Sequence, residues 1–77
     1  MSESRPMTER ERKLFSILRT AMEREREAQA MYTEAAQLCD DPVMRAVLEE
    51  FHADERRHEQ EVTARYHQFR NAFPSEI

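Results

Sequence analysis

The chain has 77 residues, 36% of them charged, with a formal net charge of -4, one cysteine and no glycine, and its length allows one small domain. Its arginines are interleaved with acids, which argues against binding to nucleic acid or to a membrane surface, and no apolar run reaches the roughly 18 residues of a membrane span. The single cysteine excludes a disulfide framework within one chain, and an N-terminus without the apolar core of a signal peptide favours a cytoplasmic protein.

A helix is expected over about residues 9–38. Thr8 followed by Glu11 has the pattern of a capping box, in which each side chain accepts a hydrogen bond from the other residue's backbone amide. The residues that follow are mostly good helix formers. Residues 1–7 before the box are expected to be a tail.

A second helix is expected over about residues 42–71. Asp41 suits the N-cap and Pro42 suits the first helical position, where no amide hydrogen is needed. This helix should end before Phe73, which precedes a proline, and residues 74–77 should form a second tail. Because the connection is so short, the sequence predicts an all-α, antiparallel hairpin as a single domain.

Each helix carries a seam of apolar or small residues at steps of three or four, the spacing of packed helices. The seam positions are 14, 18, 21, 25, 28, 32, 35 and 39 on the first helix, and 44, 48, 51, 55, 58, 62, 66 and 69 on the second. Three of these positions hold ionisable residues, Glu25, Glu55 and His58. Glu25 lies 15 residues before Asp40 and Glu55 lies 15 after it, so both should sit about 22 Å from the turn. His58 follows one turn later on the same face.

These three residues together predict a metal site. Burying ionised carboxylates in an apolar seam costs several kcal/mol per ion unless they are paired, and a cation would offset that cost. Dinuclear sites in four-helix bundles take one Glu from each of two helices and a Glu-x-x-His pair from each of the other two. This chain holds one of each. A symmetric dimer would supply four Glu and two His for two divalent cations, and it would also cover an apolar stripe too wide for one partner helix.

The chain resembles a half-length member of the ferritin-like superfamily, close to the rubrerythrin and bacterioferritin pattern. The resemblance rests on Glu25-x6-Tyr32, the short turn containing Asp41-Pro42, and Asp54-Glu55-x-x-His58, and it covers about residues 10–70. Half-length proteins of this kind include the encapsulated ferritins, whose di-iron centre lies between two chains. Ala28 stands where rubrerythrins carry a further carboxylate, so the pattern is closer to bacterioferritin.

The resemblance implies a dimer that forms a ferritin-like four-helix bundle with ferroxidase activity. Two iron ions per dimer would be held by Glu25, Glu55 and His58, with Glu55 as the bridging acid, and oxidised by O2 or peroxide. Zinc, manganese or calcium could substitute for iron. The resemblance also allows a ring of dimers and an enclosing protein nanocompartment, although the final residues FPSEI contain no convincing targeting tail.

Several alternatives remain open from the sequence. The three seam residues could fix helix register in a non-enzymatic dimerisation module, with or without a structural metal. Tyr32 is either a core aromatic or an outer partner of a ligand. Glu59 and Glu61 could form an entry site for cations.

Overall fold

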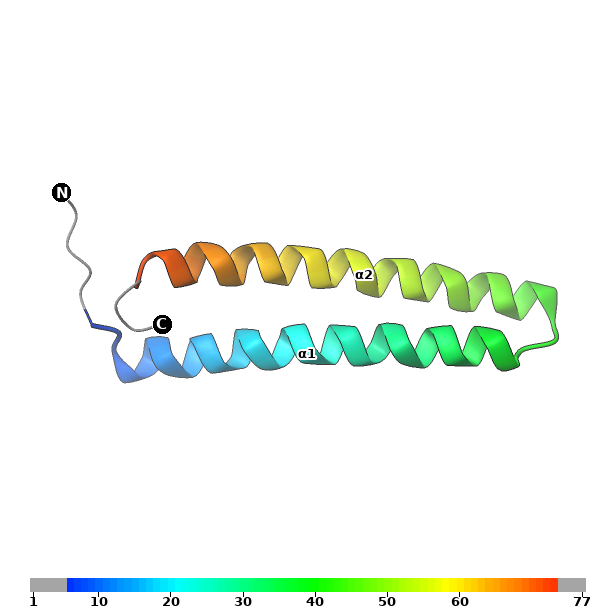
Figure 1. The fold of residues 1–77 in the computed structure, drawn as a ribbon, viewed down its shortest axis with the longest axis horizontal. Helices are drawn as coiled ribbons and strands as arrows, with labels where there is room; N and C mark the ends of the chain where they lie inside the picture. The colour runs from blue at the N-terminus through cyan, green and yellow to red at the C-terminus, as the bar shows by residue number, and fades with distance from the viewer. Residues whose placement is uncertain (1–5, 74–77) are drawn as a thin grey trace.

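Residues 6–73 are described by a computed structural model of the protein. They form two antiparallel helices, α1 (Glu9–Leu38) and α2 (Pro42–Asn71), joined by a short turn, and the start of α1 lies beside the end of α2 (Figure 1). The described residues contain no strand. The predicted all-α hairpin is therefore confirmed, whereas expectations for residues 1–5 and 74–77 lie outside the described part of the chain.

Side-chain caps set the start of each helix. The Thr8 hydroxyl accepts a hydrogen bond from the Glu11 amide at 3.1 Å, and the Glu11 carboxylate accepts one from the Thr8 amide at 2.9 Å. At α2, the Asp41 carboxylate accepts a hydrogen bond from the Val43 amide at 3.0 Å, and Pro42 occupies the first turn. Both caps are those that the sequence predicts.

The hairpin is one layer of helices and has little interior. It measures 57 × 22 × 15 Å and has a radius of gyration of 17.2 Å, whereas a compact domain of this length has about 11 Å. Its accessible surface of 6170 Å² exceeds the roughly 5000 Å² of a compact monomer of the same mass. The excess is mostly a consequence of two long helices touching along one side only.

The buried core lies at the open end of the hairpin, opposite the turn. Its buried members are Met7, Phe15 and Phe73, and Tyr66 and Phe69 pack against them. The Phe15 ring lies 4.7 Å from the Tyr66 ring, centroid to centroid. The structure thus differs from the sequence expectation, since Met7 belongs to the core and not to a tail.

The inward residue of this turn of α1 is Phe15, which is buried, and not Leu14, which the seam predicted and which is 47% exposed. The reason is size: the inward position faces two aromatic rings of α2, and a phenylalanine fills that space. The seam predicted from periodicity is therefore wrong by one residue at this turn.

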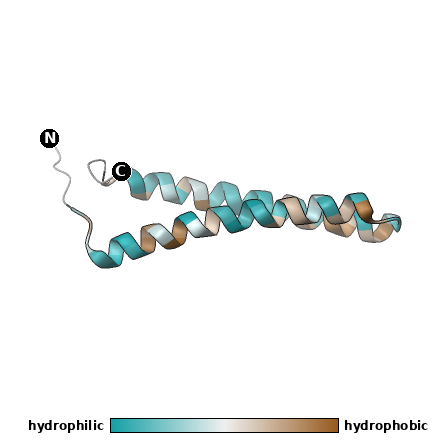
Figure 2. Cartoon of the chain, turned by 60° about the horizontal axis from the view of Figure 1, so that its bottom comes forward, coloured by the Kyte–Doolittle hydropathy of each residue, from teal (hydrophilic) through white to brown (hydrophobic). Residues whose placement is uncertain are grey.

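A broad apolar surface of the hairpin stays open. Its large exposed residues are Leu14, Ile17, Met31, Leu38, Val43, Met44 and Phe51, and Figure 2 shows hydrophobic segments on both helices near the turn and in the first half of α1. Three of these, Leu14, Met44 and Phe51, were expected in the buried seam, and the single hairpin leaves them exposed. Neither described helix contains the apolar stretch that crossing a bilayer requires.

Candidate metal centre

Glu25, Glu55 and His58 meet midway along the hairpin. One carboxylate oxygen from each acid and one imidazole nitrogen of His58 all lie within 4.8 Å of one another. Glu25 comes from α1, and the other two residues stand three positions apart on α2, where helical spacing places them on one face. The equal heights predicted from the turn thus bring the three side chains together.

The three side chains lie within ion-pair distance of one another but share no direct hydrogen bond through His58. His58 Nδ1 lies 3.9 Å from Glu25 Oε2 and 3.8 Å from Glu55 Oε2, beyond hydrogen-bond distance. Glu25 Oε2 is buried and has no hydrogen-bond partner among the described residues. A buried carboxylate oxygen in this state is costly.

The pKa of Glu25 is raised above its ordinary value. The largest cause is the Glu55 carboxyl, with which a protonated Glu25 can share a hydrogen bond, followed by burial and by the negative charge of Glu55; the charge of His58 acts in the opposite direction. The neighbouring Glu55 carboxyl therefore makes the ionised form of Glu25 less favourable than in a free glutamate.

The donor set suits a divalent cation. Carboxylate oxygens and imidazole nitrogens bind such ions at about 2.0–2.2 Å, so two ligands of one ion lie about 3–3.5 Å apart. The observed 3.8 and 3.9 Å separations need only a small side-chain movement to reach that spacing. Mixed carboxylate and imidazole ligands are typical of iron, manganese and zinc.

One side of the cluster is open. The side chains of Glu25 and Glu55 are 25% exposed and that of His58 is 49% exposed. An open hollow on this side is lined by Glu25 and His58 together with Ala21, Glu61 and Arg65. The structure therefore places Glu61 at the rim of the cluster, although it does not test whether cations enter there.

Both carboxylate oxygens of Glu59 accept hydrogen bonds from side chains of α1. Its Oε2 accepts a hydrogen bond from Arg26 Nε at 2.7 Å, and its Oε1 accepts one from Gln29 Nε2 at 2.7 Å. These two bonds lower the pKa of the Glu59 carboxyl. Sequence reasoning missed both α1 partners, because Gln29 lies 11 residues from Asp40 and Glu59 lies 19 residues from it, so equal distance from the turn does not pair them.

Tyr32 packs on an aromatic ring. Its ring centroid lies 5.5 Å from that of Phe51, and it lines an open hollow nearer the turn. The contact fits the core-aromatic alternative, while its role as an outer partner of a ligand remains a prediction.

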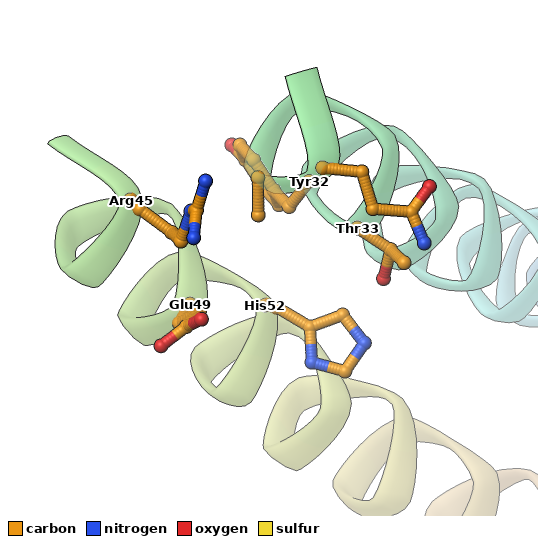
Figure 3. A pocket seen from close by; sticks show the side chains of 7 residues that line it. Tyr32, Thr33, Arg45, Glu49 and His52 are labelled. Carbon is orange, nitrogen blue, oxygen red and sulfur yellow. The ribbon is translucent and has the colours of Figure 1, made fainter. Parts of the chain in front are cut away.

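A second Glu-x-x-His pair, Glu49 and His52, precedes the first on α2 and was not singled out from the sequence. Both residues line the hollow that contains Tyr32, and Figure 3 shows them across from Tyr32 and Thr33 of α1. The two pairs have the same spacing. Among the described residues, however, the one cluster of three or more ligand-type side chains consists of Glu25, Glu55 and His58, and Glu49 and His52 are not part of it.

Known proteins add no constraint on this site. No family model, curated protein or solved structure matches the chain.

Proposed function

We propose that two copies of the hairpin pair through their open apolar faces into a four-helix bundle that binds two Fe(II) ions and oxidises them. Each chain contributes Glu25, Glu55 and His58, so the complete site has four carboxylates and two imidazoles. Four carboxylates balance two divalent cations. The proposed assembly resembles the ferritin-like superfamily and, because the site is shared between chains, the encapsulated ferritins.

The observation that carries this proposal is the buried Glu25 Oε2, which accepts no hydrogen bond from the described residues and lies beside Glu55 and His58. A polar cluster that fixed helix register would need complementary partners, but here two acids share a site and raise the pKa of one of them. A cation explains the cluster better because it binds all three donors and offsets the repulsion between the acids.

The chain's residues would act on iron as a substrate. Glu25 binds from α1, His58 binds from α2, and Glu55 spans the two ions, so that the pair is held at one separation. Oxidation removes one electron from each of two Fe(II). One O2 accepts both electrons with two protons and becomes H2O2; with peroxide as oxidant, two electrons and two protons give two waters.

A matched pair of double variants tests the proposal. Anaerobic protein is given Fe(II) and then O2, and Fe(III) formation is followed by absorbance. Wild type should oxidise iron faster than buffer does, and Glu55→Ala/His58→Ala should lose the gain. Glu49→Ala/His52→Ala removes the same residue types at the same spacing on the same helix and should keep it. Equal rates for wild type and Glu55→Ala/His58→Ala would refute the proposed site.

The second candidate is a non-enzymatic dimerisation module with a structural metal. The broad exposed apolar surface favours pairing whether or not iron is oxidised. Metal bound in purified protein that leaves the rate of iron oxidation at that of buffer would favour this candidate. Zinc is the ion to expect in that case, since it has no redox chemistry.

A further inference from the structure

The polar contacts that cross between α1 and α2 beside the cluster form a connected network. Glu59 of α2 uses one carboxylate oxygen for Arg26 and the other for Gln29, both at 2.7 Å. Gln29 Nε2 also donates to the Glu25 backbone carbonyl at 3.2 Å. The network therefore ties the backbone of Glu25 to the residue that follows His58.

Glu25 and its helix need such a tie because the apolar seam defines register poorly. Directly before and after Glu25 the seam of α1 carries the small residues Ala21 and Ala28, and small side chains interlock weakly with a facing helix. A slip of one residue moves a helix by about 1.5 Å, which would take Glu25 out of reach of a shared ion, since ligands must be placed within about 0.5 Å.

We propose that Arg26, Gln29 and Glu59 form a register clamp, which sets the height of α1 against α2 and thereby places Glu25 opposite Glu55 and His58. The consequence for metal binding rests on the proposed function, whereas the effect on register rests on the hydrogen bonds alone. In this role Glu59 is a positioning residue, and its engaged oxygens make it a poor entry site for cations. The register-fixing role considered for the cluster belongs instead to its neighbours.

For the removal of Arg26, an effect of charge alone and an effect of positioning predict opposite changes in cation affinity. Arg26 stands next to Glu25, so removing its positive charge would remove Coulomb repulsion of a bound cation and should by itself strengthen cation binding. Removing a positioning contact should weaken it. Arg57 provides the matched control: it stands next to His58, and its ion pair at 3.1 Å is with Asp54 of its own helix.

The experiment compares Arg26→Ala, Gln29→Ala and their double variant with Arg57→Ala. In metal-free protein, register is followed by NMR through the nuclear Overhauser effects between the Tyr32 and Phe51 rings, which are 5.5 Å apart. The double variant should lose or broaden these signals and Arg57→Ala should keep them. If the double variant loses helical content, the two single variants provide the same comparison.

Metal-loaded protein gives the second readout, with Co(II) as the probe. The clamp variants should bind Co(II) about tenfold more weakly, the scale of losses from outer partners of metal ligands, with an altered absorption spectrum. Arg57→Ala should bind it equally or more tightly. Exchanging the charges, Arg26→Glu/Glu59→Arg, should recover both the spectrum and the ring signals, which a general loss of stability would not explain.

Unchanged ring signals and unchanged Co(II) affinity in the double variant would overturn the clamp. Failure of the wild type to bind Co(II) would count against the proposed function, and the NMR comparison in metal-free protein would then decide the clamp by itself.

Discussion

Two histidines of α2, His52 and His58, occupy the same position in two Glu-x-x-His pairs, yet only His58 joins an acid from the other helix in a group of ligand-type residues. The Glu-x-x-His spacing alone therefore does not identify a metal site. The face of α2 on which the pair lies decides whether it meets an acid of α1. Six residues turn a helix by about 600°, or 120° short of two full turns. The Glu55–His58 pair faces Glu25 across the seam, and the Glu49–His52 pair is turned towards the hollow of Figure 3.

The first prediction follows from this difference between the two histidines. His58→Ala should raise the dissociation constant for Fe(II), measured anaerobically by calorimetry, by about tenfold or more, since loss of even an outer partner of a ligand costs about 10–100-fold. His52→Ala should leave the constant unchanged. An equal loss in both variants would indicate a general effect of histidine on the helix and would contradict the assignment of His58.

The second prediction concerns pH and Glu25. Because the folded-state pKa of Glu25 is raised, its contribution to stability is fully present below the ordinary glutamate range and is lost as pH rises through the raised value. With a chelator present, the Tm of wild type should therefore fall relative to that of Glu25→Gln as pH rises from the ordinary glutamate pKa through the raised pKa of Glu25. At neutral pH, metal-free Glu25→Gln should be at least as stable as metal-free wild type. Thermal melts by circular dichroism measure the difference.

Glu34→Gln is the control for this pH series because it removes an exposed carboxyl from the same helix; its melting curve should follow that of wild type. A Glu25→Gln variant that is less stable than wild type at neutral pH, in the absence of metal, would contradict the strain assigned to the paired acids and would favour a structural role for Glu25.

At the scale of the helices, the sequence predicted the ends better than the interior. Thr8 with Glu11 and Asp41 with Pro42 are local signals, because a cap is completed within a few residues of itself. The buried aromatic cluster depends on contacts between residue 15 and residues 66–73, and no local pattern reports which side of α1 will face them. Met7 was missed for the same reason.

The third prediction tests the cap of α1. Thr8→Ala removes the acceptor of the Glu11 amide and should cost about 1 kcal/mol, which lowers Tm by roughly 4–8 °C for a domain of this size. Thr33→Ala, an exposed change in the interior of the same helix, should leave Tm equal or slightly higher, since alanine is the better helix former. Equal melting of the two variants would contradict the capping box.

In the candidate site, too, one contact could be predicted from the sequence and others could not. Equal distance from the turn was enough to bring Glu25 to Glu55, because rise per residue is constant in a helix. The contacts of Arg26 and Gln29 with Glu59 were not foreseen. Long polar side chains on a helix surface have several partners within reach, and periodicity does not choose among them.

For the whole molecule, exposed apolar surface and the open side of the cluster meet on one face of α1. Ile17 is 53% exposed and lines an open hollow with Ala21 and Glu25. A second hairpin seated on this face would bury the apolar surface and bring further carboxylates to the cluster. Stable interfaces cover about 800 Å² on each partner, which two helices of 30 residues can supply.

The fourth prediction is that pairing and metal binding are lost together. Native mass spectrometry of iron-loaded protein should give a dimer with about two ions. Ile17→Asp places a charge in the proposed interface and should give a monomer with few ions, whereas Thr33→Asp, about 160° further around α1, should leave both unchanged. Because each chain brings only three ligands, a monomer should hold an ion weakly. A wild-type monomer that retains two ions would contradict the shared site, and a dimer of Ile17→Asp with full metal content would place the interface on another face of the hairpin.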